Sequence, residues 1–348
     1  MASSIPGARF AEYLAARKPQ IEAALSSHTP QATQASNAVA SDLATYLYEP
    51  YARLASSGGK RVRSALCLLG AEAVGSDPMA ALTCAAAVET FQNAALIHDD
   101  IADHSVMRRG APCLHVSEGE GQAIVIGDLG VVHSFDLLIG DLDLEAELCL
   151  ALLDELVVME HYTSEGQALD IAWARDSRWD ISEQDYLAMA TLKTAYYSAS
   201  TPLAMGARVG GGDDNQIEAL RAFGLDAGLA FQIADDLLNL EGDAEAQGKD
   251  YRSDITEGKR TLVAVYALAH AGEHRDELLG LLSSGTTNPA DLARAVELFD
   301  QTGALAYAHE MASDLSTRAQ TRLFGVELVP NCKDILLSMA DYFVGRTA

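Results

Sequence analysis

The sequence has 348 residues, of which 49% are hydrophobic and 21% are charged, a composition typical of a globular protein with a sizeable core. It carries 24 Lys and Arg against 50 Asp and Glu, so its formal net charge is −26. Nucleic acids and anionic membrane surfaces require a basic protein face, so this balance argues against both as partners.

The cysteines and the N-terminus give no sign of export. Five cysteines are widely spaced and contain no Cys-x-x-Cys pair, which is not the pattern of a disulfide framework or a zinc site. The first residues lack a basic flank followed by an apolar stretch, and no window reaches about 18 uninterrupted apolar residues. We therefore expect a soluble, cytoplasmic protein without stable membrane insertion.

Helical periodicity dominates the chain from residue 36 onward. Ala and Leu are abundant, while runs of β-branched and aromatic residues typical of strands are nearly absent. Residues 1–34 are interpreted as an N-terminal extension, and residues 241–259, which lack apolar periodicity, as a loop or lid. The sequence thus predicts one all-α domain over residues 1–348, a large helical bundle around a central cavity. Helices are expected over residues 36–56, 60–75, 79–104, 120–138, 144–173, 183–209, 213–240, 258–271, 290–302, 304–324 and 331–344.

Two acidic clusters occur near the ends of apolar helical segments. In the first, Asp99 and Asp103 are four residues apart and project from one helical face. In the second, Asp235 shares its face with Asn239. Like charges on one face destabilise a bare helix, so we expect a cation between them, and two such oxygen-rich clusters suit Mg²⁺. The full set of acids is Asp99, Asp100, Asp103, Asp235 and Asp236.

Two other interpretations of the acids remain open. Either cluster taken alone is compatible with exposed or helix-capping aspartates in a chain with 50 acids. A His/Asp metal site of the helical phosphohydrolase type would use His98, His104 and His115 with Asp99. That site would need a further upstream His, and none lies between His28 and His98, so it is disfavoured.

The basic residues are few and occupy unusual positions. Only six lysines occur, and Lys60 follows Gly58-Gly59 while Lys249 and Lys259 each follow a glycine. Glycine lets the backbone approach a ligand closely, and Lys and Arg form charge-assisted hydrogen bonds with phosphate. The pattern therefore predicts a buried polyanion. The other members of this set are Arg63, Arg108, Arg109 and Lys193, which precedes Thr194. No phosphate-binding glycine motif of the common nucleotide folds is present, so an ordinary nucleotide site is not supported.

Taken in order, these motifs resemble those of the trans-isoprenyl diphosphate synthase, or polyprenyl synthetase, family from about residue 35 to the end. The ordered set is specific even though no single motif is decisive. It comprises GGKRVRS at 58–64, DDIAD at 99–103, RRG at 108–110, GQALD at 166–170, KT at 193–194, FQIADDLLN at 231–239, and GK at 248–249 and 258–259.

The resemblance implies a Mg²⁺-dependent prenyl transfer between an allylic diphosphate and isopentenyl diphosphate, with three Mg²⁺ ions and a homodimer. Metal ligands would be Asp99, Asp103 and Asp235, supported by Asp100 and Asp236. Arg108, Lys193 and Lys249 would hold the allylic diphosphate, with Lys259, Thr194, Gln232 and Asp170 nearby. Isopentenyl diphosphate would bind through Lys60, Arg63, Gln92 and Arg109.

The reaction implied by the resemblance needs no protein nucleophile. Mg²⁺ and cations stabilise the departing diphosphate, the resulting carbocation is attacked by the isopentenyl double bond, and proton loss completes the step. Closure of the lid would exclude water. The chain departs from the family pattern at Ser64, where Pro is frequent, and at Asn239, where Asp is usual; we expect activity to survive both.

Product length is expected to depend on the helix that precedes Asp99. The residues four and five positions earlier are Ala95 and Ala94, whose small side chains leave the path open beyond farnesyl. Phe91 lies eight residues before Asp99, about 12 Å along the helix, and would stop the chain about one unit later. We therefore predict geranylgeranyl diphosphate, with farnesyl or a longer diphosphate as the alternative. Phe91 as ordinary core packing is equally compatible with the pattern.

Two rival functions share part of this pattern. A class I terpene cyclase would have the first Asp-rich motif but no use for an isopentenyl diphosphate site. A non-catalytic subunit of a heteromeric prenyltransferase typically loses aspartates or cations, whereas both motifs remain here. The synthase accounts for more of the residues.

Overall fold

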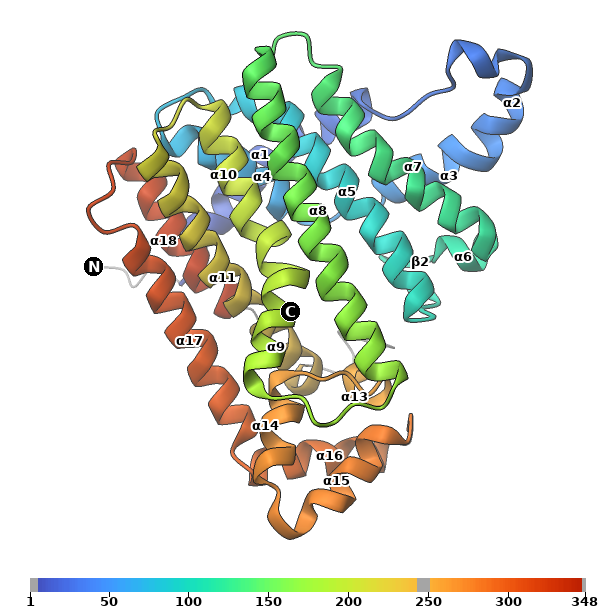
Figure 1. Cartoon of the computed structure of the whole chain (residues 1–348), viewed down its shortest axis with the longest axis vertical. Coiled ribbons are helices and arrows are strands. Elements are labelled where there is room, and N and C mark those ends of the chain that lie inside the picture. The colour runs from blue at the N-terminus through green and yellow to red at the C-terminus, as the bar shows by residue number, and fades with distance from the viewer. Residues whose placement is uncertain (1–5, 243–250, 346–348) are drawn as a thin grey trace.

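The computed structural model describes residues 6–242 and 251–345, and almost all of its regular structure is helical (Figure 1). The all-α class predicted from the sequence is confirmed. The long helices lie side by side and bury their apolar faces against one another. The central ones are α4 (Val62–Ala73), α5 (Leu82–Ala102), α7 (Glu120–Ile139), α8 (Ala146–Arg175), α10 (Thr201–Val209) and α11 (Asp214–Glu241).

The C-terminal helices complete the bundle on one side and at one end. α17 and α18 pack against α11, while α14, α15 and α16 gather at the end of the molecule where the chain is coloured orange (Figure 1). α15 was not among the predicted helices. The bounds are α14 (Leu262–His270), α15 (Arg275–Ser283), α16 (Pro289–Gln301), α17 (Ala304–Arg322) and α18 (Pro330–Val344).

The N-terminal part differs from the prediction. Helix α1 (Ala8–Ser27) forms where no helix was predicted, and it packs on α18 through Phe10, whose ring meets Phe343 edge-on. The predicted helix 36–56 is divided into shorter turns. These are η1 (Gln34–Val39), α2 (Ala40–Leu43), η2 (Ala44–Tyr48, a π-helix) and α3 (Glu49–Ala55).

Helices α4 and α10 pack so closely that their backbones are in contact. A Cβ atom at Gly206 would lie 1.9 Å from the Cys67 carbonyl oxygen, and one at Gly70 would lie 2.3 Å from that of Leu203. Only glycine fits at either point. This contact draws α4 close to α10 and fixes the position of Arg63 on α4.

A short hairpin follows the first acidic cluster. Strands β1 (Met107–Arg108) and β2 (Ala111–Pro112) pair in antiparallel register around Arg109 and Gly110, whose φ angles are +52° and +79°. Two positive φ angles characterise the tight turn that suits a two-residue hairpin. The hairpin was not predicted, and it places two arginines next to the cavity described below.

The predicted lid over residues 241–259 is described only in part. Residues 243–250, which include Lys249, lie outside the described residues. Within the described portion, a four-residue helical turn, α13 (Ser253–Thr256), lies between turns.

Two helical stretches are long and apolar enough to cross a membrane by length and composition alone. The first is Pro78–Ala102, whose most apolar window is 72% buried within the protein. The second is α7, whose corresponding window is 39% buried, so much of its apolar surface faces outward. For the first stretch, burial in the bundle core accounts for the composition.

Candidate active site

A cavity of about 610 Å³ opens between α5, α8, α11 and the segments that join them. One end is lined by carboxylates and lysines, among them Asp99, Asp170, Lys193, Asp235 and Lys259. The other end is largely apolar. The cavity therefore combines a charged end with an apolar end, which suits a substrate that has a polar head and a hydrocarbon tail.

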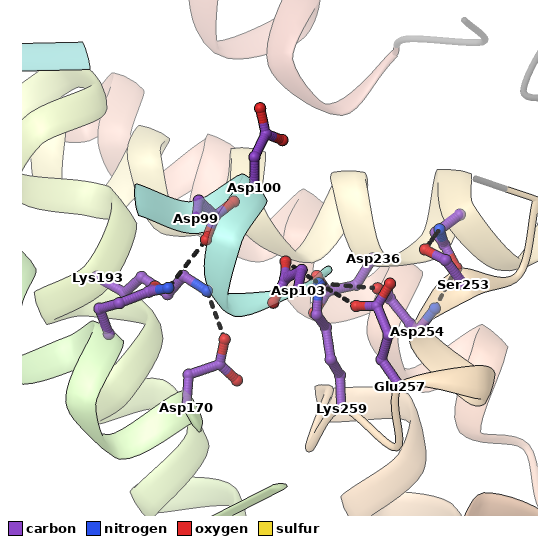
Figure 2. Close-up of polar contacts among 12 residues, drawn as sticks. Asp99, Asp100, Asp103, Asp170, Lys193, Asp236, Ser253, Asp254, Glu257 and Lys259 are labelled. Carbon is purple, nitrogen blue, oxygen red and sulfur yellow. Dashed lines mark hydrogen bonds and ion pairs between the residues drawn. The ribbon is translucent and has the colours of Figure 1, made fainter. Parts of the chain in front are cut away.

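The first acidic motif lies at the end of α5, with its three carboxylates in different environments. Asp99 lines the cavity and accepts a hydrogen bond of 2.9 Å from Gln167. Asp100 is buried and points away from Asp103 (Figure 2), towards Arg108, whose Nε and Nη2 lie 2.7 and 2.6 Å from its Oδ1. The structure thus joins Asp100 to Arg108, and the predicted supporting role of Asp100 at the metal stays a prediction.

Lys259 joins the first acidic motif to the segment beyond α11. Its ammonium lies 2.8 Å from Glu257, 3.5 Å from Asp103 and 3.7 Å from Asp254 (Figure 2). Burial alone would lower the pKa of Lys259, but these carboxylates raise it well above its ordinary value. Burial raises the pKa of Asp103 and of Asp254 against the opposing effect of the Lys259 charge.

Three residues of the GQALD motif on α8, Gly166, Gln167 and Asp170, each make a contact at the site. At Gly166 a Cβ atom would lie 2.2 Å from the Lys193 backbone nitrogen, so glycine lets α8 and the Lys193 backbone touch. Gln167 holds Asp99, and Asp170 accepts a hydrogen bond from the Lys193 ammonium. Burial opposes both charges, yet this ion pair lowers the pKa of Asp170 and raises that of Lys193.

Lys193 lies on a π-helix, η4 (Thr191–Ser200), inserted between α9 (Glu183–Ala190) and α10. The sequence predicted one continuous helix over residues 183–209. A π-helical segment adds a residue to the turn and re-aims the side chains that follow, and such segments are frequent at functional sites. This one directs Lys193 and Thr194 into the cavity.

The second acidic motif, on α11, places both of its acids at the cavity. Asp235 and Asp236 line it, and Asp236, which is buried, accepts hydrogen bonds of 2.7 Å from both Tyr186 and Gln232. Gln232 in turn accepts one of 2.6 Å from Thr194. Burial and the neighbouring Asp254 carboxylate raise the pKa of Asp236. These hydrogen bonds hold Asp236 in the cavity wall, and its predicted supporting role at the metal stays a prediction.

Asn239, the departure in this motif, links α11 to α13. Its Nδ2 donates to the Ser253 hydroxyl over 3.1 Å, and its Oδ1 accepts from the Asp254 backbone N–H over 3.2 Å. The amide therefore fixes the start of the segment that carries Asp254 and Lys259. Only the donor role of Nδ2 is specific to an amide, because an aspartate could accept hydrogen bonds from the same backbone N–H and from the Ser253 hydroxyl.

A second basic group lies around the loop before α4. Arg109 donates to the Ser57 hydroxyl over 3.2 Å, and a Cβ atom at Gly59 would lie 3.2 Å from its Nη2. Burial, together with the like charge of Arg61, lowers the pKa of Arg109. Lys60 is exposed next to this loop. The hairpin and the Gly58-Gly59 loop thus come together as a positively charged surface.

Arg63 and Gln92 are further predicted members of this group. The Arg63 guanidinium lies over the Tyr197 ring at 4.2 Å and donates to Ser198 over 2.7 Å. Two buried atoms, Nε of Arg63 and Oε1 of Gln92, have no hydrogen-bond partner among the described residues. Buried polar atoms nearly always have partners, so these are positions for a ligand or water.

The apolar end contains two of the three residues predicted to control chain length. Phe91 and Ala95 line the cavity, and the Phe91 ring meets Tyr197 edge-on at 6.1 Å. Ala94 is fully buried against Gly130 of α7 and is absent from the described lining. Adjacent residues of a helix point about 100° apart, so only one of the two alanines faces the cavity.

Several functional residues were missed in the sequence analysis. Tyr186 and Asp254 line the cavity, and Glu257 pairs with Lys259. No motif marks them, although Asp254 and Glu257 precede Lys259 by five and two residues and a search around that lysine would have found them. Within the described ranges, no three His, Cys, Asp or Glu side chains are close enough to hold a metal ion by themselves.

Comparison with known proteins agrees with this geometry. The polyprenyl synthetase family model matches residues 44–299. The short chain isoprenyl diphosphate synthase of Methanothermobacter thermautotrophicus is 40% identical over 296 residues, covering 84% of this chain and 88% of the relative. A geranylfarnesyl diphosphate synthase of Natronomonas pharaonis is 34% identical (86% and 90% covered), and a geranylgeranyl diphosphate synthase of Methanosarcina mazei is 35% identical (86% and 90%).

Solved structures extend the similarity to the whole fold. The geranylgeranyl pyrophosphate synthetase from Pyrococcus horikoshii superimposes with a TM-score of 0.85 at 30% identity, covering 97% of this chain and 98% of that one. A geranylgeranyl pyrophosphate synthase from Corynebacterium glutamicum, complexed with isoprenyl diphosphate and magnesium, gives 0.80 at 29% identity, covering 98% and 97%. The motifs, the helical fold and these matches agree: the chain is a prenyltransferase that belongs to the polyprenyl synthetase family.

Proposed function

We propose that the protein condenses isopentenyl diphosphate with an allylic diphosphate to form an all-trans prenyl diphosphate, with geranylgeranyl diphosphate as the main product. The observation that carries the proposal is the cavity itself, in which a charged end opens onto an apolar channel. The charged end suits two diphosphates, and the channel suits a growing hydrocarbon chain.

The allylic diphosphate would bind between the two acidic motifs. Lys193 and Lys259 line this end and would hold its oxygens by charge-assisted hydrogen bonds. Lys249 is proposed to join them, although it lies outside the described residues. Arg108, whose guanidinium pairs with Asp100, would contribute charge from the rim. This arrangement concentrates positive charge where the leaving group departs.

The oxygen donors at this end fit magnesium. Asp99, Asp103 and Asp235 offer hard carboxylate ligands, and Mg²⁺ is commonly held by one or two carboxylates together with substrate phosphates. Bound there, Mg²⁺ would neutralise the charge that develops on the departing diphosphate. Gln167 would orient Asp99 for that role through its hydrogen bond of 2.9 Å.

Isopentenyl diphosphate would bind at the second basic group, through Lys60, Arg63, Gln92 and Arg109. The partnerless Nε of Arg63, a hydrogen-bond donor, supports this assignment. So does the Gly58-Gly59 loop, whose lack of side chains lets a diphosphate approach the backbone. The double bond of isopentenyl diphosphate would then face the allylic carbon.

The proposal is tested with the purified full chain, isopentenyl diphosphate, geranyl or farnesyl diphosphate, and Mg²⁺. Extraction and mass analysis should give a longer prenyl diphosphate, mainly the geranylgeranyl compound. Hydrocarbon products would identify a terpene cyclase instead. Absence of turnover by the pure chain would favour a subunit that needs a partner.

Replacing Phe91 by alanine should lengthen the products. Phe91 lines the apolar end about 12 Å from Asp99 along α5, so its removal opens space for at least one further isoprene unit. Mass analysis of the products from farnesyl diphosphate measures the change. Ala94→Gly, at the neighbouring position that faces α7, is the control. Unchanged products in an active Phe91→Ala enzyme would remove Phe91 from this role.

Replacing Gly166 by alanine should weaken the allylic substrate. The added methyl group would meet the Lys193 backbone nitrogen and Cα at 2.2 and 2.6 Å, so η4 must shift and carry the lysine away from the diphosphate. Overpacking of this kind typically costs about 1–3 kcal/mol. We expect a KM for the allylic diphosphate raised by about tenfold or more, measured by substrate titration. Gly121→Ala, where no atom lies within 4 Å, should leave KM unchanged; equal KM values for both variants would contradict the role of Gly166.

A homodimer is also proposed. Val125, Val132 and Ile139 of α7 are spaced seven residues apart and are 50%, 65% and 62% exposed, which forms an apolar stripe along the outer side of the helix. A contiguous apolar surface of this type is typical of a protein interface. Sedimentation equilibrium of the full chain measures the state directly.

A further inference from the structure

We infer that Glu160 is a specificity-determining residue whose carboxyl group limits how far the prenyl chain extends along the cavity. Glu160 lies on α8, lines the cavity and was not singled out by any sequence motif. The inference rests on the proposed function, since it requires a hydrocarbon chain that grows in this cavity.

The depth of Glu160 follows from the contacts between helices. Gln167 donates to Asp99, so these residues lie at one level of α8 and α5. Glu160 precedes Gln167 by seven residues, and Phe91 precedes Asp99 by eight. At a rise of 1.5 Å per residue, Glu160 and Phe91 lie about 10 and about 12 Å from that level along their helices. Both are therefore near the far end of the path, provided that α5 and α8 run in the same direction.

Helix α7 fixes that direction. Gly127 of α7 lies against His98, and Gly130 of α7 lies against Ala94. Residue numbers therefore rise along α7 in the direction in which they fall along α5, so the two helices are antiparallel. Helices α5, α7 and α8 lie next to one another (Figure 1). Ser134 lies one turn further along α7, and its hydroxyl donates a hydrogen bond to Glu160 of α8. The two turns of α8 from Gln167 to Glu160 therefore lie beside the two turns of α5 from Asp99 to Phe91, and Glu160 and Phe91 lie at a similar depth.

The surroundings of Glu160 are unusual for a buried acid. The residue is 8% exposed, and Ser134 donates to its Oε1 over 2.9 Å. Across residues 6–242 and 251–345, no Lys, Arg or His forms an ion pair with it. Glu155, five residues earlier on the same helix, is equally buried but lies 2.5 Å from Arg221 and 3.1 Å from Arg208. Glu155 has the partners of a structural acid, and Glu160 does not.

The cavity lining contains apolar residues from two other helices, Phe91 and Ala95 of α5 and Val131 of α7, and the polar Thr163 and Ser164 next to Glu160 on α8. Burial raises the pKa of Glu160 to about 7. A prenyl unit that reaches this depth would cover the carboxyl group and remove its last contact with water. Burying a polar group without compensation is unfavourable, and burying a charged one is more so. Growth past Glu160 is thus opposed by polarity, whereas Phe91 opposes it by volume.

The test compares two substitutions that separate polarity from size. Glu160→Leu keeps a side chain of similar volume but removes the polar group, and Glu160→Gln keeps size and hydrogen bonding but removes the charge. Full-length enzyme is incubated with isopentenyl and farnesyl diphosphates and Mg²⁺, and products are measured by mass. We expect Glu160→Leu to shift the main product by at least one isoprene unit and Glu160→Gln to shift it less. The control Glu147→Leu, at an exposed position of α8, should give wild-type products.

An active, folded Glu160→Leu enzyme with wild-type products overturns the inference, because loss of polarity would then not matter. If Glu160→Leu does not fold, Glu160→Met, which also removes the polar group at similar volume, decides the question, and an unchanged product distribution overturns the inference in the same way. Failure of the wild-type chain to elongate any allylic diphosphate overturns the proposed function instead, which separates the two outcomes.

Discussion

Replacing Asp99 by alanine should lower kcat by about 10²–10³-fold, the scale for loss of one preorganised electrostatic stabiliser. Asp99 lines the cavity beside Lys193 and is held in place by Gln167, so its carboxylate is aimed before substrate binds. Asp235→Ala, on the opposite wall, should have a comparable effect. Steady-state kinetics with saturating Mg²⁺ measure both.

A second measurement distinguishes weaker Mg²⁺ binding from a loss of folding stability in these variants. Calorimetric titration of Mg²⁺ into enzyme with a non-hydrolysable allylic diphosphate analogue should show weakened binding in Asp99→Ala, while the thermal unfolding temperature changes little. Asp314→Asn, an exposed acid on α17, is the control for charge. Asn239→Ala should be milder than Asp99→Ala because its amide positions α13 through two hydrogen bonds. Near-normal turnover in Asp99→Ala is incompatible with the proposed site.

Helix positions were largely predictable because long apolar periodicity is a strong signal. The failures have physical causes. Helix α1 contains Pro19 in its interior, which sequence reasoning treats as a helix breaker, yet contact with α18 and α4 stabilises it. The π-helical segment at Lys193 could not be predicted because its residues have ordinary helical composition; in the structure its backbone lies against Gly166 of α8.

Site residues could be predicted where acids follow an apolar helical segment. Asp99, Asp103 and Asp235 were predicted in this way, and Asp99 and Asp235 line the cavity. The partners of Asp100 and Asp236 could not be predicted, because the sequence does not show that Asp100 pairs with Arg108 or that Asp236 accepts a hydrogen bond from Tyr186, which lies 50 residues away in the chain. Such partners depend on tertiary packing.

Glu160 was overlooked for a related reason. A single glutamate in a helix with many polar positions is normally an exposed residue, and nothing in its spacing distinguishes it from Glu165, which is exposed. The packing of α7 against α8 buries Glu160 and leaves Glu165 exposed. The same burial makes the charge state of Glu160 a property that can be measured.

Stability should therefore fall with rising pH through this one residue. Burial raises the pKa of Glu160 from its ordinary 4.5 to about 7, so the folded protein holds the proton more tightly than the unfolded chain. The stabilisation linked to that proton is fully present below about pH 4.5 and is lost as the pH rises through about 7. Since one pKa unit corresponds to about 1.4 kcal/mol, the full loss is about 3 kcal/mol, and most of it falls between about pH 5 and pH 8.

The Glu160→Gln variant isolates this contribution because an amide does not titrate in that range. Urea unfolding at pH 5 and pH 8 should show that the variant gains about 2–3 kcal/mol of unfolding free energy relative to wild type between the two pH values. Other buried acids, such as Asp236 and Asp254, titrate in both proteins and cancel in the difference. Glu147→Gln, at an exposed position of the same helix, should show no such gain. A pH-independent difference for Glu160→Gln would mean that water reaches the carboxyl group, and its polarity could then no longer oppose a hydrocarbon chain.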